Sequence, residues 1–166
     1  MKQLLWEYAH YNLWANKKIA WLVSNNHEEL IDKPLVSSFA SIRSTIYHIW
    51  DAELIWLKRL QGESITFWPS KAAENMGMQF FDTWHKTSIS LIDFVENADE
   101  QYLDFEIQYS NMKGMVYSQS GYQILMHIFN HGTYHRGQVV TMFRNAGVTN
   151  DFPKMDLIDF YRENQR

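Results

Sequence analysis

The sequence lacks cysteine, which excludes disulfide bonds, thiolate metal ligands and a cysteine nucleophile. It also lacks any run of basic residues, and 15 Lys and Arg against 19 Asp and Glu give a net charge of −4. An acidic chain without a basic patch is a poor match for a nucleic-acid groove. We therefore expect no nucleic-acid partner.

Long apolar runs are missing as well. A transmembrane helix needs roughly 20 consecutive apolar residues, and no stretch of this sequence approaches that length. The first residues, MKQLLWEYAHYNLWANKK, are interrupted by Glu7, His10 and Asn12, so they lack the unbroken apolar core of a signal peptide. These absences predict a cytoplasmic protein with no membrane partner.

The composition that remains is typical of a globular protein, with 46% hydrophobic and 20% charged residues. A chain of 166 residues has the size of one ordinary domain and is long enough to bury a hydrophobic core without disulfide bonds or structural metals. Because no repeat or linker divides it, we expect one domain over residues 1–166.

Four long segments carry apolar residues at the three- and four-residue spacing of an amphipathic helix. We predict helices over 2–25, from the serines at 37–41 to Leu60, over 78–97, and from Ser118 or Ser120 to Asn145. The segment 62–77 is expected to be a loop, and residues 154–163 a short final helix. Apolar and polar residues partly alternate in 102–109, and the turn-like stretch 110–114 precedes Met115-Val116-Tyr117, which indicates a β-hairpin. The predicted fold is an all-α four-helix bundle with a small β-hairpin insertion before the last long helix.

Histidines are the main chemical asset of a chain without cysteine, and three of them recur at four-residue spacing, His127, His131 and His135. On an α-helix four residues advance about 400° and about 6 Å, so adjacent members of the series share one face. Two imidazoles so placed can bind one metal ion, but the outer two are about 12 Å apart, so only one adjacent pair can do so. His48, in the middle of the second helix, is the natural third ligand.

Several motifs resemble the DinB/YfiT-like family of metal-dependent helical bundles. IYHIWDAELIWLKRLQG at 46–62 resembles its second helix, and HIFNHGTYHRGQ at 127–138 with FRNAG at 143–147 resembles its last long helix. YNLWANKKI at 11–19 and DFPKMDLIDFY at 151–161 are similar to the family's first helix and C-terminus.

The resemblance implies three metal ligands, His48, His131 and His135, with zinc or nickel as the ion. It also implies an up-down-down-up bundle and frequent homodimers. His127 then lies one turn from the ligands, in a packing or supporting role.

Three neutral ligands leave at least one coordination position open, which is typical of a catalytic metal site. An ion that keeps its full charge lowers the pKa of a bound water or thiol. The resemblance implies a transferase that uses a low-molecular-weight thiol and a small-molecule electrophile. A metal-dependent hydrolase, and a non-catalytic stress-response protein with a structural metal, are the alternatives.

On spacing alone, the polar neighbours of the three histidines have alternative roles. Asp51 either approaches the site or orients a histidine ring N–H, or it is a solvated helix residue, and Gln138 either packs or hydrogen-bonds to a ligand. Glu53 is rotated about 140° from His48, so we do not expect it to be a ligand. Arg136 is expected to pair with a carboxylate or to support the structure.

Overall fold

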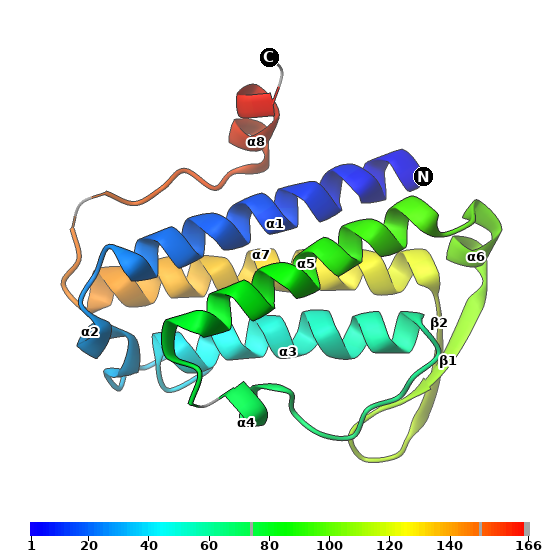
Figure 1. The fold of residues 1–166 in the computed structure, drawn as a ribbon, viewed down its shortest axis with the longest axis horizontal. Helices are drawn as coiled ribbons and strands as arrows, with labels where there is room; N and C mark the ends of the chain where they lie inside the picture. Colours follow the sequence, from blue (N-terminus) through cyan, green and yellow to red (C-terminus); the bar gives the residue numbers. More distant parts are fainter. Residues whose placement is uncertain (74, 150, 165–166) are drawn as a thin grey trace.

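The computed structural model describes residues 1–73, 75–149 and 151–164 and is mostly helical, with one small sheet. The long helices are α1 (Lys2–Ser24), α3 (Ile42–Leu60), α5 (Phe80–Asn97) and α7 (Gly121–Asn145) (Figure 1). The short ones are α2 (Glu28–Asp32), α4 (Ser70–Ala73), α6 (Glu100–Asp104), α8 (Leu157–Asn164) and the 3-10 turn η1 (Gly77–Gln79). The all-α class with a hairpin insertion is therefore confirmed.

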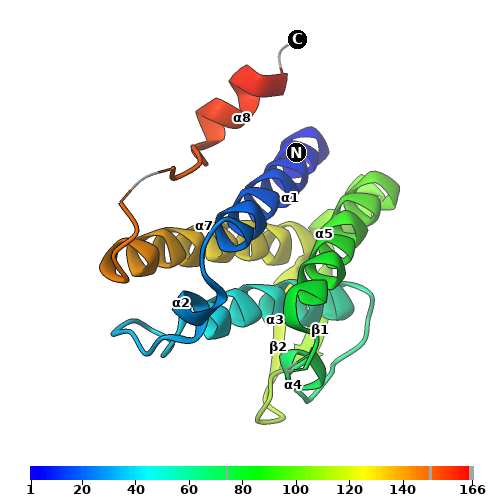
Figure 2. The ribbon, with the colours of Figure 1, turned by 60° about the vertical axis from the view of Figure 1, so that its left-hand side comes forward.

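The long helices lie side by side in both views of the ribbon (Figures 1 and 2). α3 contacts α7 and α5, and α1 contacts α5 and α7. Their apolar faces meet in a core whose largest fully buried side chains are Trp84, Phe80, Phe129 and Phe143. Burial of such rings removes apolar surface from water, which is the main favourable term for this arrangement. The contact between α3 and α7 positions the histidines.

Local hydrogen bonds explain where α3 and α7 begin. Ser41 Oγ accepts the backbone N–H of Ser44, and Ser44 Oγ accepts that of Ser41, which forms a reciprocal capping box. At the start of α7, the backbone N–H of Ser120 donates to Gln123 Oε1. Both helices thus begin directly after a serine that the sequence offers as a start signal.

The sheet is a hairpin of two antiparallel strands, β1 (Glu106–Ser110) and β2 (Val116–Ser120), which pair Tyr109 with Tyr117. Asn111 Oδ1 accepts the N–H groups of Lys113 and Met115, and Gly114 takes a φ of 77° in the connection. A positive φ suits glycine because it has no Cβ. The hairpin directly precedes α7, as the alternating pattern predicts.

The C-terminal helix α8 lies against α1. Its Phe160 packs on the rings of Tyr11 and Trp14, and Glu163 accepts a hydrogen bond from Trp14 Nε1 at 2.8 Å. In both ribbon views α8 extends beyond the long helices (Figures 1 and 2). None of the helices in the described ranges is both long enough and apolar enough to cross a membrane.

Candidate metal centre

Three histidine rings converge where α3 meets α7. His48 comes from α3, and His131 and His135 come from successive turns of α7. The Nε2 atoms of His48 and His131 are 2.9 Å apart, and one ring nitrogen from each of the three histidines lies within 4.8 Å of the other two. The structure thus brings together the three histidines that the family resemblance implies, and leaves His127 outside their cluster.

These nitrogens suit a divalent transition-metal ion. Two nitrogens bound at about 2.0–2.1 Å to a tetrahedral ion are about 3.4 Å apart. The separations here, from 2.9 Å to at most 4.8 Å, bracket that value, so small ring rotations reach it. Burial lowers the pKa of His48 to about 4, and the charge of the neighbouring His135 contributes a smaller decrease. Burial and the adjacent histidines lower the pKa of His131 to about 3. Both rings are therefore neutral near pH 7, which is the form that binds metals.

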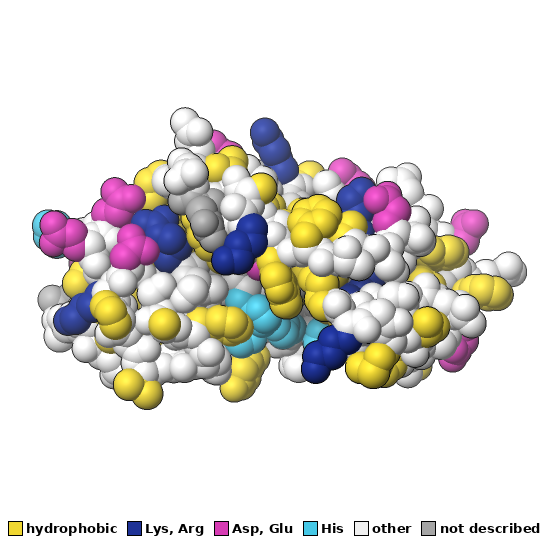
Figure 3. Space-filling model, turned by 90° about the horizontal axis from the view of Figure 1, so that it is seen from below, with side chains coloured by type: hydrophobic (Ala, Val, Ile, Leu, Met, Phe, Trp, Pro, Cys, Tyr) yellow, Lys and Arg dark blue, Asp and Glu magenta, His cyan; other side chains and the backbone are white. Residues whose placement is uncertain are grey.

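The cluster lies at the surface of the protein. His135 is buried, whereas His48 and His131 are half-buried. Figure 3 shows the face that lies at the bottom of Figure 1, with histidine side chains gathered near its middle and hydrophobic side chains beside them. Such partial exposure leaves room for a small molecule to reach an ion held by the three rings.

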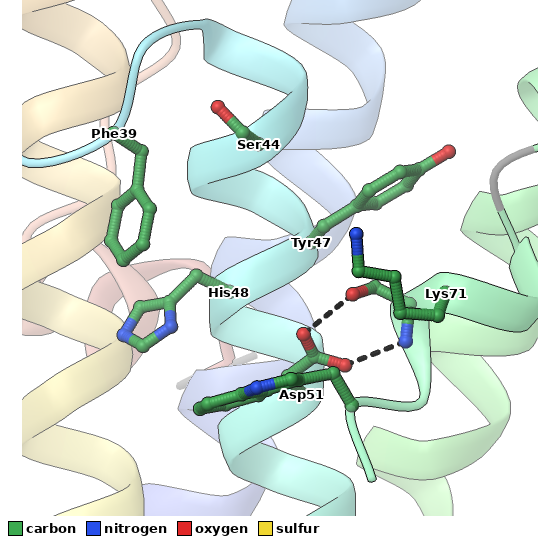
Figure 4. A pocket seen from close by; sticks show the side chains of 8 residues that line it. Phe39, Ser44, Tyr47, His48, Asp51 and Lys71 are labelled. Atoms are coloured by element: carbon green, nitrogen blue, oxygen red, sulfur yellow. Dashed lines mark hydrogen bonds between the residues drawn. The ribbon is translucent and has the colours of Figure 1, made fainter.

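A cavity of about 320 Å³ opens beside His48 (Figure 4). The ring of Phe39 lies 4.3 Å from that of His48 and 5.7 Å from that of His135. The cavity has mostly apolar walls with a few polar groups, the usual character of a small-molecule site. Its lining consists of Phe39, Ser44, Tyr47, His48, Asp51, Trp68, Ser70 and Lys71.

Asp51 holds one wall of this cavity in place. Its two carboxylate oxygens accept the backbone N–H and the hydroxyl of Ser70, at 2.7 and 2.6 Å (Figure 4). Burial raises the pKa of Asp51, while the bonds from Ser70 and the charge of Lys71 act in the opposite direction. Asp51 approaches the site, one of the predicted alternatives, because it lines the cavity beside His48. It is not solvated, since it is only 4% exposed, and its hydrogen bonds join α3 to Ser70 at the start of α4 and not to a histidine ring.

Gln138 hydrogen-bonds to a histidine of the cluster, one of the two predicted alternatives. Its Oε1 atom lies 2.7 Å from His135 Nδ1, and its Nε2 atom donates to Ser38 Oγ at 2.9 Å. Because an amide oxygen can only accept a hydrogen bond, the ring proton of His135 lies on Nδ1. The lone pair of its Nε2 atom is therefore free.

His127 lies beside the cluster in a packing position. Its ring is 5.6 Å from that of His131 and 5.0 Å from that of Trp56, measured between centroids. Partial burial and the positive charge of Arg59 lower the pKa of His127.

A buried polar network lies behind the histidines. Glu53 Oε1 accepts hydrogen bonds from Asn12 and Asn16 at 2.8 and 2.7 Å, and its Oε2 atom accepts one from Ser88 at 2.7 Å. Arg136 Nη1 donates to the Oδ1 atoms of the same two asparagines at 2.7 and 2.8 Å. The network joins all four long helices, because one or more of its members lie on each.

This network clarifies two predictions. Glu53 is not part of the histidine cluster, as its rotation from His48 predicts, and Arg136 reaches the carboxylate through two asparagines. Sequence reasoning missed the asparagines themselves. Their four-residue spacing on an otherwise apolar face of α1 was the available signal.

Two comparisons relate this chain to known proteins. The model of the DinB family matches residues 1–165. The curated relative "Protein DinB" of Bacillus subtilis (strain 168) is 26% identical over 156 residues, which cover 89% of this chain and 88% of that protein. The family match spans all the long helices and the three histidines that converge between two of them. The chain therefore belongs to the DinB family.

Proposed function

We propose that the protein binds one divalent transition-metal ion, zinc or nickel, through His48, His131 and His135. We further propose that it transfers a low-molecular-weight thiol to a small electrophile. The observation that carries the proposal is the 2.9 Å separation between the Nε2 atoms of His48 and His131, two residues that are 83 positions apart in sequence. Neutral imidazole is a common ligand of both ions.

The protein's own residues would bind and orient the reactants. Three histidines leave at least one position open on an ion. When bound, the ion supplies Lewis acidity that lowers the pKa of a thiol toward neutrality. The cavity walled by Phe39 and Trp68 would hold the electrophile beside that position. The reaction between the two bound molecules would then be effectively unimolecular. The sulfur forms a bond to the electrophilic carbon as its leaving group departs with the bonding electrons, and the thiol proton goes to solvent.

The architecture around the site belongs to the same proposal. In Figure 1, α1 and α7 run from right to left while α3 and α5 run from left to right, which supports an up-down-down-up four-helix bundle. We also propose a single domain, a cytoplasmic location and a homodimer, the last of which light scattering in solution tests directly.

The test pairs elemental analysis with a thiol-consumption assay on protein purified without chelators or a metal-affinity column. We expect one zinc or nickel ion per chain, and thiol consumption with chlorodinitrobenzene only when the metal is present. His135→Ala should abolish both. Ester hydrolysis without added thiol would instead indicate a hydrolase, and a metal that affects only the melting temperature would indicate a structural role. Protein without bound metal would contradict the whole proposal.

A further inference from the structure

A second cavity lies on the side of α7 that faces away from the histidine cluster. Its lining comes from α7, from Tyr11 of α1 and from residues 152–156. Arg144, which lines it, follows His135 by nine residues, or about two and a half turns, so the two side chains leave opposite faces of α7. With a volume of about 470 Å³, the second cavity is larger than the one beside His48 and has the size of a small-molecule site.

Residues 152–156 form one wall of the second cavity. They lie between α7 and α8 in the chain (Figures 1 and 2). The hydroxyl of Tyr11 donates to the carbonyl of Met155 at 2.8 Å, and the ring centre of Phe152 lies 4.7 Å from the guanidinium carbon of Arg144. Phe152 and Met155 also pack against the hydrophobic core. The wall is therefore held in place on both helices, and it presents apolar side chains to the cavity.

The lining of the second cavity has an excess of positive charge. It contains three cationic side chains, Arg136, Arg144 and Lys154, and one acidic side chain, Asp156. Arg136 lies in the field of the buried Glu53. Neither Arg144 nor Lys154 forms an ion pair with any acidic residue that the structure describes. Two exposed cations against one carboxylate favour an anionic ligand.

Hydrogen-bond donors accompany this charge. Arg136 is only 2% exposed; its Nη1 atom donates to two asparagines and its Nη2 atom to Thr133, but Nε has no partner within the described ranges. A buried donor without an acceptor is unfavourable, so this end of the cavity favours a ligand that brings an oxygen. Arg144 stacks on Phe152 through the face of its guanidinium, which leaves the N–H groups at the edge available to a carboxylate or phosphate.

We propose that the second cavity binds a small organic anion, whose carboxylate or phosphate group pairs with Arg144 and Lys154. The apolar body of the ligand packs against Phe152 and Met155. Because the cavity and the histidine cluster lie on opposite faces of α7, binding needs neither a metal ion nor the three histidines. The site is thus independent of the proposed transferase activity.

The experiment compares benzoate with benzamide, which have the same ring and differ in charge. The backbone amide resonance of Gly137, a residue of the cavity lining, reports binding in an NMR titration. We expect benzoate to bind at least about tenfold more tightly, which corresponds to about 1.4 kcal/mol. The double variant Arg144→Gln with Lys154→Gln should remove that preference. Lys86→Gln with Lys113→Gln, which deletes two exposed charges elsewhere, should preserve it. Equal dissociation constants in the wild-type protein, or an unchanged preference in the Arg144 and Lys154 variant, would overturn the proposal.

Further probes identify the anion and test the apolar wall. Phenyl phosphate replaces benzoate in the same titration, and the tighter of the two ligands shows whether the site takes a phosphate or a carboxylate. Acetate should bind more weakly than benzoate, because it lacks the ring that packs against Phe152. Acetate that binds as tightly as benzoate would contradict the role given to this wall.

A last variant locates the bound anion. His131→Ala removes a proposed metal ligand on the opposite face of α7, and benzoate should still shift the Gly137 resonance in that variant. A shift that persists while metal binding is lost would support the second cavity whatever becomes of the proposed function. A shift that disappears would mean that the anion binds at the histidine cluster, which would overturn the proposal.

Discussion

The Nδ1 atom of His135 lies 2.7 Å from Oε1 of Gln138, and the amide nitrogen of the same glutamine donates to Ser38. This contact fixes the ring orientation of one proposed ligand. We expect Gln138→Leu to weaken zinc binding by about 10–100-fold, the usual effect of removing a hydrogen-bond partner from a ligating histidine. Competition with a fluorescent chelator measures the change. Ser38→Ala is the matched control, because it removes the loop contact alone; an equal loss of affinity there would assign the effect to the loop.

Removal of a proposed ligand should have a larger effect than removal of its neighbour. We expect His131→Ala to reduce bound metal from one ion per chain to almost none, and His127→Ala, one turn away on the same helix, to retain it. Elemental analysis after gel filtration measures both. A metal content that depends on His127 as strongly as on His131 would mean that the other adjacent pair binds the ion.

The stability of metal-free protein should depend on pH through the two histidines with the lowest pKa. Folding lowers the pKa of His48 to about 4 and that of His131 to about 3, from an ordinary value of 6.5. The unfolded state therefore binds more protons below 6.5, so the free energy of unfolding should fall as the pH falls from 6.5 toward 4.

Urea unfolding at about pH 7.5 and about pH 5.5, on either side of the ordinary histidine pKa, measures this fall. The double variant His48→Asn with His131→Asn should show a smaller decrease than the wild-type protein. An identical decrease in both proteins would assign the pH dependence to other groups.

The buried network should contribute more to stability than any surface ion pair. Glu53→Ala leaves Arg136 without its carboxylate, so we expect the free energy of unfolding to fall by about 3–5 kcal/mol. Glu53→Gln keeps the shape and most of the hydrogen-bonding capacity, and should cost less. Urea titrations of both variants test this. A loss below about 1 kcal/mol for the alanine variant would show that the network is structurally dispensable.

Asp51 should affect the cavity without affecting the metal. Asp51→Ala removes two charge-assisted hydrogen bonds to Ser70, each worth about 1.5–3 kcal/mol, and should expose the start of α4 to limited proteolysis. Ser70→Ala removes only the hydroxyl bond and should have a weaker effect. Loss of bound metal in Asp51→Ala would mean instead that this carboxylate supports the histidines.

The sequence predicted the long helices well because each has a long amphipathic period and a clear boundary. The start of α7 at Gly121 follows from Ser120, and its end at Asn145 from the Ala146-Gly147 that follows. The short helices α2, α4 and α6 were missed, since four or five residues are too few to show a period. α5 begins two residues later than predicted, because residues 77–79 form a 3-10 turn instead.

For the candidate site, spacing alone could indicate a histidine pair but could not decide which pair. In the structure, the rings of His131 and His135 face that of His48 across the contact between two helices. Asp51 could not be placed from its spacing, because its partner Ser70 lies in a segment with no periodic pattern. Long-range polar contacts of this kind depend on where loops return, which local sequence does not encode.

His48 precedes His131 by 83 residues along the chain. No fragment that stops short of α7 contains all three imidazoles of the cluster, so a nascent chain has only one of them until the last long helix has emerged from the ribosome. The complete histidine cluster is therefore available only to a chain that already carries α1, α3 and α5.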